Sequence, residues 1–201
     1  GGDVLTGGGG SDTITYAGSG SGVTVRLDNG QASGGDAEGD TFSSIENLTG
    51  SDHADSLRGS SAANRLNGGS GDDVLVGLGG ADTLVGGNGI DTASYVASVA
   101  GVTVQLDSGL ATGGDAAGDT FSSIENLTGS SHADSLRGNG LVNRLEGGAG
   151  DDVLNGRGGA DALVGGGGAD TATYVNSAAG VTARLDWAAS TVGEAEGDTF
   201  D

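Results

Sequence analysis

The feature that most constrains this chain is a nine-residue repeat, in which a glycine-rich turn is followed by one large aliphatic residue. The clearest copy, at residues 68–76, reads G-G-S-G-D-D-V-L-V. Copies in the same frame lie at 50–58, 59–67, 77–85 and 86–94, and the frame returns over 129–173. Because a short fixed period is the sequence signature of a solenoid, we expect stacked coils that share one continuous core.

A second, longer period is marked by the evenly spaced tyrosines Tyr16, Tyr95 and Tyr174. It divides the chain into blocks of nonapeptides joined by inserts that lack the nine-residue frame. We expect the end of a first block at 1–15, complete blocks at 50–94 and 129–173, inserts at 16–49 and 95–128, and a partial insert at 174–201. Since the chain begins inside a nonapeptide and stops inside an insert, we expect it to be an excerpt of a longer protein.

The composition argues against an ordinary globular core. Of 201 residues 45 are Gly, only 3% are aromatic, and the net charge is -21. Glycine loses the most backbone entropy on folding, and like charges repel in a compact state. Such a chain is expected to be disordered unless something neutralises it. The many short carboxylates point to cations, while the lack of Cys excludes disulfides and thiolate metal sites.

The same charge balance excludes several classes of partner. Nucleic acids and acidic membrane surfaces both require a basic patch, and this chain has 7 basic residues against 28 acidic ones. A membrane-spanning helix needs an apolar run of about 18 residues or more, and none is present, so we expect no membrane insertion. We expect a monomeric module whose partners are metal ions.

Nonapeptides in strict register, found again one long period later, resemble the RTX family of hemolysin-type calcium-binding repeats, with the consensus G-G-x-G-x-D-x-U-x. The resemblance implies an all-β fold, a right-handed parallel β-roll (β-solenoid) with short strands and calcium-filled Gly/Asp turns. Two nonapeptides then form one coil, and coils stack about 5 Å apart. The inward aliphatic positions are expected to be Leu48, Leu57, Leu66, Leu75, Leu84, Ala93, Leu127, Leu136, Leu145, Leu154, Leu163 and Ala172.

The resemblance also implies the metal ligands. Ca²⁺ takes six to eight oxygen ligands at about 2.3–2.6 Å, and in this family each ion lies between turns that are two nonapeptides apart. The expected side-chain pairs are Asp55 with Asp73, Asn64 with Asp82, Asp73 with Asp91, Asp134 with Asp152, Asn143 with Asp161, and Asp152 with Asp170; Asp12 stands at the same position in the first block. The expected carbonyl donors are Gly69, Gly71, Gly80, Gly87, Gly89, Gly148, Gly150, Gly159, Gly166 and Gly168.

Some copies depart from the consensus. Asn64 and Asn143 replace the acid, while His53 and His132 replace the glycine at position four. We therefore expect the strongest sites between copies 68–76 and 86–94, and between copies 147–155 and 165–173. The two histidines are expected to fill turns, and Trp187 is expected to pack.

The inserts leave alternatives open. The G-V-T-V-x-L-D segment at 101–107 predicts a strand, so the insert either continues the solenoid as a wider coil or forms a small hairpin outside it. Asp36 and Asp40, with Asp115 and Asp119, either hold another ion or form a solvated acidic loop. Glu46 and Glu125 either ligate Ca²⁺ or cap a coil.

No nucleophile–base pair, phosphate-binding loop or zinc motif is evident, so we expect no enzyme activity in this chain. The resemblance implies a secreted, extracellular or cell-surface protein of bacterial type I secretion that folds on several Ca²⁺ ions outside the cell. We expect a structural, secretion-supporting segment or an adhesin stalk. The alternative is a non-catalytic C-terminal accessory domain of a secreted RTX-like protease, lipase or polysaccharide epimerase.

Overall fold

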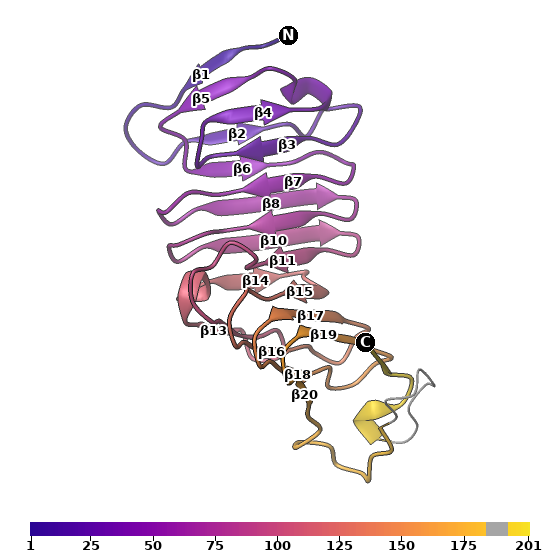
Figure 1. Ribbon diagram of the computed structural model, residues 1–201. Coiled ribbons are helices and arrows are strands. Elements are labelled where there is room, and N and C mark those ends of the chain that lie inside the picture. Colours follow the sequence, from indigo (N-terminus) through magenta and orange to yellow (C-terminus); the bar gives the residue numbers. More distant parts are fainter. Residues whose placement is uncertain (184–192) are drawn as a thin grey trace. The chain divides into compact units, whose positions relative to one another are not determined.

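A computed structural model describes residues 1–183 and 193–201 (Figure 1). These residues form short strands, turns and three 3-10 helices, with no α-helix. They divide into a first unit, Gly1–Ser94 with Ala117–Ile124, and a second unit, Tyr95–Ala116 with Glu125–Asp201. No described helix is long and apolar enough to cross a bilayer. Trp187 and part of the last insert lie outside the described residues.

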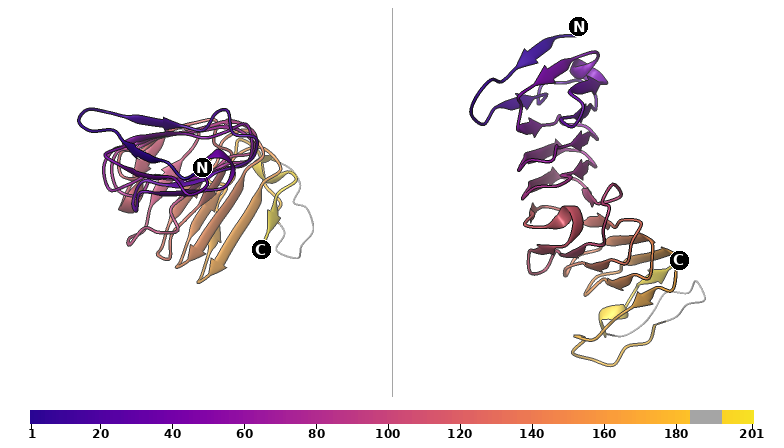
Figure 2. Two further views of the ribbon diagram at one scale, coloured as in Figure 1. Left: turned by 90° about the horizontal axis from the view of Figure 1, so that it is seen from above. Right: turned by 60° about the vertical axis from the view of Figure 1, so that its left-hand side comes forward.

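The nonapeptides of the first unit build two parallel sheets that share one core. One sheet contains β7 (Ser56–Arg58), β9 (Val74–Val76) and β11 (Thr92–Ser94); the other contains β6 (Asn47–Thr49), β8 (Arg65–Ser70) and β10 (Thr83–Asn88). Leu57 pairs with Leu75, and Leu66 pairs with both Leu48 and Leu84. Successive strands of a sheet are thus two nonapeptides apart, as the repeat predicts, and Figure 2 shows them stacked.

The second unit repeats this arrangement. Its strands are β16 (Ser135–Arg137), β18 (Val153–Asn155) and β20 (Thr171–Ala172) in one sheet, and β15 (Asn126–Thr128), β17 (Arg144–Ala149) and β19 (Ala162–Gly167) in the other. Leu136 pairs with Leu154, and Leu145 pairs with Leu163. The prediction of a parallel β-roll (β-solenoid) is confirmed.

Stacked leucines form the core of each unit. Every predicted inward leucine is at most 2% exposed, and burial of each stabilises the fold by about 1.5–3 kcal/mol. Successive side chains of a strand point to opposite faces, which explains why Leu75 is fully buried while its neighbour Val74 is 39% exposed. Ala93 is buried as expected. Ala172 pairs with the inward Leu154 as expected, but it is exposed because β20 is the outermost strand of its sheet.

Four strands are longer than their three-residue neighbours such as β7 and β9. β8, β10, β17 and β19 each have six residues, because the strand continues into the glycine turn. Gly69 pairs with Gly87, and Gly148 pairs with Gly166 in the second unit. A Cβ on Gly87 would collide with the Gly69 carbonyl oxygen, so these two turns stack this closely only because Gly87 has no side chain.

The first insert continues the solenoid and contains a hairpin within its sheet. β3 (Thr24–Arg26) runs parallel to β7, with Val25 opposite Leu57, and β4 (Gln31–Ser33) returns antiparallel to β3. After η1 (Gly35–Ala37), β5 (Thr41–Ser43) pairs in parallel with β1 (Val4–Thr6). β2 (Thr13–Thr15), which precedes the insert, pairs in parallel with β6. The expected wider coil and the alternative hairpin are therefore both present, but the hairpin does not lie outside the solenoid.

The other inserts repeat these elements where they are described. β12 (Thr103–Gln105) and β13 (Leu110–Thr112) form the hairpin, and β12 runs parallel to β16. η2 (Gly114–Ala116) and η3 (Gly193–Ala195) match η1. β14 (Thr120–Ser122) pairs with β10, and β21 (Thr199–Phe200) pairs with β19.

Candidate metal sites

At position six of the consensus, the backbone N–H of one residue donates to the side chain of the residue two nonapeptides later; we call these series of hydrogen bonds the acid ladder. The backbone N–H of Asp55 donates to Oδ1 of Asp73 at 2.8 Å, and the N–H of Asp73 donates to Oδ1 of Asp91 at 2.8 Å. The same bond joins Asn64 to Asp82 at 2.7 Å, Asp134 to Asp152 at 2.8 Å, Asn143 to Asp161 at 2.8 Å, and Asp152 to Asp170 at 3.0 Å. The structure thus brings together all six side-chain pairs that the sequence predicts.

Several ladder acids keep one buried oxygen without a donor. The Oδ2 atoms of Asp12, Asp73, Asp152 and Asp161 are buried and have no hydrogen-bond partner. Asp73, Asp152 and Asp161 are each 1% exposed. Buried polar atoms are nearly always hydrogen-bonded, and an unpaired buried carboxylate is costly. A hard cation beside these oxygens would remove that cost.

The pKa values of these acids reflect their burial and the neighbouring carboxylates. Burial raises the pKa of Asp73 to about 7, and the nearby carboxylates of Asp55 and Asp91 add to the increase. Burial likewise raises the pKa of Asp161 to about 7 and raises that of Asp152 above its usual range. The ladder therefore holds like charges close together in a desolvated place, which a divalent cation would stabilise.

The turn glycines allow these acids to lie against the backbone. All ten glycines expected as carbonyl donors have positive φ, from 98° at Gly166 to 144° at Gly89 and Gly168, where non-glycine residues are strained. A Cβ on Gly68 would collide with Oδ2 of Asp73, and one on Gly147 would collide with Oδ2 of Asp152. Glycine is required at these positions because the acid lies against the backbone.

The ligand chemistry favours Ca²⁺ over zinc. The described residues contain no group of three or more His, Cys, Asp or Glu side chains that would hold a metal ion. An ion at the ladder would therefore take at most two carboxylates and draw its other ligands from backbone carbonyls. An all-oxygen set of this kind suits Ca²⁺, whereas structural zinc sites use Cys and His.

In the turns that depart from the consensus, the position-six side chains form hydrogen bonds with other protein groups. Asp55 accepts hydrogen bonds from Val23 N–H at 2.7 Å and from Ser51 N–H. Asn64 donates through Nδ2 to the Glu46 carbonyl at 2.8 Å. The second unit repeats these arrangements at Asp134 and Asn143. These side chains already have hydrogen-bond partners, and which sites bind most strongly stays a prediction. Their ligation of Ca²⁺ stays a prediction.

The histidines and Glu46, the other candidates from the sequence, differ in their surroundings. His53 and His132 are exposed. Glu46 takes a ladder position, since its Oε2 accepts the Asp12 N–H at 2.9 Å. The same kind of bond occurs at Asp73, so both interpretations of Glu46 stay predictions.

Sequence reasoning only partly found the ladder acids of the inserts. Asp40 accepts the Asp3 N–H at 2.8 Å, Asp119 accepts the Asp82 N–H at 2.8 Å, and Asp198 accepts the Asp161 N–H at 2.9 Å. Asp40 and Asp119 had been grouped with other acids of the same loops, and Asp198 was missed. The available signal was the segment G-D-T-F, which occurs once in every insert at 39–42, 118–121 and 197–200.

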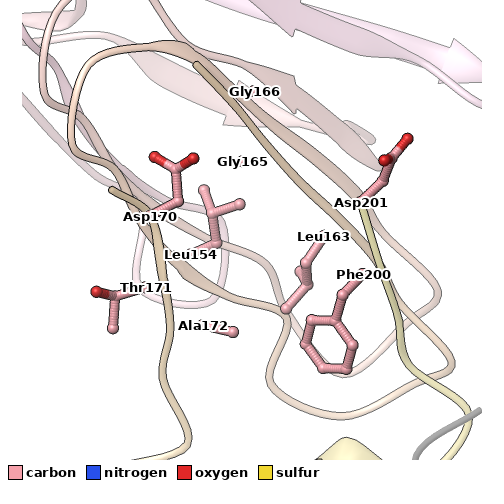
Figure 3. A pocket seen from close by; sticks show the side chains of 9 residues that line it. All are labelled: Leu154, Leu163, Gly165, Gly166, Asp170, Thr171, Ala172, Phe200 and Asp201. Atoms are coloured by element: carbon pink, nitrogen blue, oxygen red, sulfur yellow. The ribbon is translucent and has the colours of Figure 1, made fainter. Parts of the chain in front are cut away.

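A pocket of about 310 Å³ opens at the end of the second unit, lined by the nine residues labelled in Figure 3. Leu163 and Phe200, paired between β19 and β21, form its apolar side. Asp170 and Asp201 are its acidic residues. Thr171 is the other polar residue of its lining.

Comparison with known protein families finds the RTX calcium-binding nonapeptide repeat in four copies, at residues 1–21, 49–84, 58–93 and 137–172. Together these segments make up about half of the chain. No curated protein matches the sequence significantly. The matched segments contain Asp12, Asp73, Asp152 and Asp161, the acids with a buried oxygen that lacks a donor.

Proposed function

The chain belongs to the RTX calcium-binding nonapeptide repeat family, and we propose that it is a calcium-dependent folding module of a secreted bacterial protein. The observation that carries the proposal is the set of buried carboxylate oxygens without donors at Asp73, Asp152 and Asp161. The ions would be held by these acids, by their ladder partners and by carbonyls of the turn glycines. When bound, Ca²⁺ supplies positive charge and links successive coils through shared oxygen ligands.

The protein's own residues prepare this site. The ladder N–H groups hold Oδ1 of each acid, while Oδ2 of Asp73 and Asp152 lies beside a turn glycine. The glycines keep the backbone close to that oxygen. The leucine column sets the spacing between coils, so that acids two nonapeptides apart meet.

Energies support a fold that depends on calcium. Extracellular Ca²⁺ modules bind with Kd values of about 10⁻⁴–10⁻³ M. At a free Ca²⁺ concentration 100 times the Kd, each independent site adds about 2.7 kcal/mol to the free energy of unfolding. A few such sites amount to a whole domain's usual stability of about 5–15 kcal/mol. A net charge of -21 and 45 glycines oppose folding when the ions are absent.

This dependence suits a protein that crosses the cell envelope unfolded. Cytosolic Ca²⁺ is far below the expected Kd values, so the chain would stay extended there and fold in a calcium-rich exterior. We infer type I secretion and a structural, secretion-supporting role outside the cell. We expect the module itself to carry out no chemistry.

Small-angle X-ray scattering would test the proposal. With a chelator present, the radius of gyration should be near that of an unfolded 201-residue chain, roughly 48 Å. Millimolar Ca²⁺ should compact the chain, whereas equal Mg²⁺ should not, because Mg²⁺ demands octahedral geometry and retains its water. The same radius in chelator and in Ca²⁺ would contradict the proposal.

A further inference from the structure

The ladder acids of the inserts differ from those of the nonapeptides in one contact. Oδ1 of Asp40 accepts the Asp3 N–H at 2.8 Å, and its Oδ2 accepts the hydroxyl of Tyr16 at 3.0 Å. Oδ1 of Asp198 accepts the Asp161 N–H at 2.9 Å, and its Oδ2 accepts the hydroxyl of Tyr174 at 2.7 Å. The two acids are 4% and 0% exposed, so water does not compete for these bonds.

Asp73 provides the comparison. It accepts the same kind of ladder bond through Oδ1 and is equally buried, yet its Oδ2 has no donor. Tyrosine therefore supplies the insert acids with the partner that the nonapeptide acid lacks. A hydroxyl bonded to a carboxylate forms a strong, charge-assisted hydrogen bond.

The tyrosines are held as donors. Burial raises the pKa of Tyr16, and its hydrogen bond to the Asp40 carboxylate raises it further. The same causes, in the same order, raise the pKa of Tyr174 beside Asp198. Both phenols therefore keep their protons near neutral pH, and the acid oxygen that would face a cation faces an O–H group instead.

We propose that each of these inserts closes the acid ladder with a tyrosine hydroxyl in place of a cation, so that Asp40 and Asp198 hold no calcium. This inference rests on the proposed function, because it assumes that the nonapeptide acids do bind Ca²⁺. The inserts then interrupt the series of ions, and the nonapeptide blocks alone set the number bound. Tyr95 and Asp119 stand at the equivalent sequence positions of the remaining insert.

Crystals of the full 201-residue chain grown in Ca²⁺ would test the inference without any substitution. Anomalous difference density should show an ion beside Asp73 and beside Asp152, and none in coordination distance of Asp40 or Asp198. An ion beside either insert acid would overturn the inference and leave the proposed function intact. No ion beside any ladder acid would refute the proposed function itself.

Ion counting by equilibrium dialysis would test the same point in solution, after circular dichroism has shown that each variant folds in Ca²⁺. Asp73→Asn should lose at least one bound ion, whereas Asp40→Asn should keep the wild-type number. If Asp40→Asn does not fold, Asp198→Asn provides the same test in the second unit. Loss of an ion from either insert variant would overturn the inference.

The hydroxyl itself needs a separate variant. Tyr16→Phe leaves Oδ2 of Asp40 without a donor, as in Asp73, and should raise the number of bound ions by one. An unchanged number would mean that the turn, and not the hydroxyl, excludes the ion, which would overturn the role given to tyrosine.

Discussion

Replacing Asp73 with Asn should change stability in opposite directions with and without calcium. The substitution keeps Oδ1, so the Asp55 N–H retains its acceptor at 2.8 Å, but it removes the charge and the oxygen that has no donor. Asp72→Asn is the matched control. Asp72 is the exposed neighbour, and its Oδ1 accepts the Ile90 N–H at 2.8 Å, which Asn also preserves.

With Ca²⁺ in excess, Asp73→Asn should lower the free energy of unfolding. Loss of one site that is saturated at 100 times its Kd costs about 2.7 kcal/mol. The control removes an equal charge from an exposed position and should change the free energy of unfolding by at most about 0.5 kcal/mol. The difference between the two variants therefore isolates the contribution of the buried oxygen.

Without Ca²⁺, the sign should reverse. Burial raises the pKa of Asp73 from 3.8 to about 7, so the ionised side chain opposes folding above that pH. A difference of about three pKa units corresponds to roughly 4 kcal/mol at 1.36 kcal/mol per unit. Asn carries no charge, so the variant should fold more readily than wild type in chelator at pH 8.

Two denaturation series would measure both effects. Urea unfolding in saturating Ca²⁺, monitored by far-UV circular dichroism, measures the decrease in the free energy of unfolding. In chelator, folding is induced with increasing trimethylamine N-oxide, which favours compact states. The gain in stability should appear as a lower midpoint concentration of this osmolyte for Asp73→Asn than for wild type. Equal behaviour of Asp73→Asn and Asp72→Asn, or a loss of similar size in both series, would refute the reasoning.

Three further predictions concern the core, the turns and pH. Leu75→Ala should lower the free energy of unfolding in Ca²⁺ by about 2–5 kcal/mol, measured by urea denaturation. Val74→Ala, on the exposed face, should lower it by less than about 1 kcal/mol. Equal losses would contradict the assignment of Leu75 to the core. Gly71→Ala, at φ 111° against the His53 backbone, should raise the Ca²⁺ midpoint by circular dichroism, whereas Gly79→Ala, with nothing within 4 Å of its Cβ position, should not. The pKa of Asp161 is raised from 3.8 to about 7 in the folded state. The protonated side chain therefore contributes stability to the calcium-free fold that is complete below pH 4 and is lost as the pH rises through 7. Lowering the pH from 8 to 5 without Ca²⁺ should therefore increase the β-structure signal in circular dichroism, and an unchanged signal would argue against buried ladder acids.

The repeat predicted those parts of the fold that depend on a fixed spacing. Because Leu57 and Leu75 are two nonapeptides apart and face the same way, one period defines the strand, its partner and its buried side chain. The ladder pairs follow from the same spacing, which is why Asp55 and Asp73 were correctly placed together. Side-chain donors that satisfy a ladder residue, such as Ser51 beside Asp55, recur with the long period at Ser130 and Asp134 but are not part of the nine-residue consensus.

The inserts were harder to predict because they change the spacing. Asp82 meets Asp119 at a separation of 37 residues, and Asp161 meets Asp198 at the same separation. A search at the spacing of two nonapeptides does not find these partners. The antiparallel strand β4 also depends on a local turn at Gly30, which has φ 67° and whose N–H donates to the Arg26 carbonyl at 3.0 Å. The contact of Tyr16 with Asp40, 24 residues away, depends on both features.

The central claim is that calcium makes this chain fold, and a far-UV circular dichroism titration from excess chelator into millimolar Ca²⁺ tests it most directly. The account predicts a disordered spectrum in chelator and one cooperative transition to β-structure, with no transition when Mg²⁺ is added instead. A β-sheet spectrum already present in chelator at pH 8 and unchanged by Ca²⁺ would contradict it, since the leucine column would then hold the solenoid without ions.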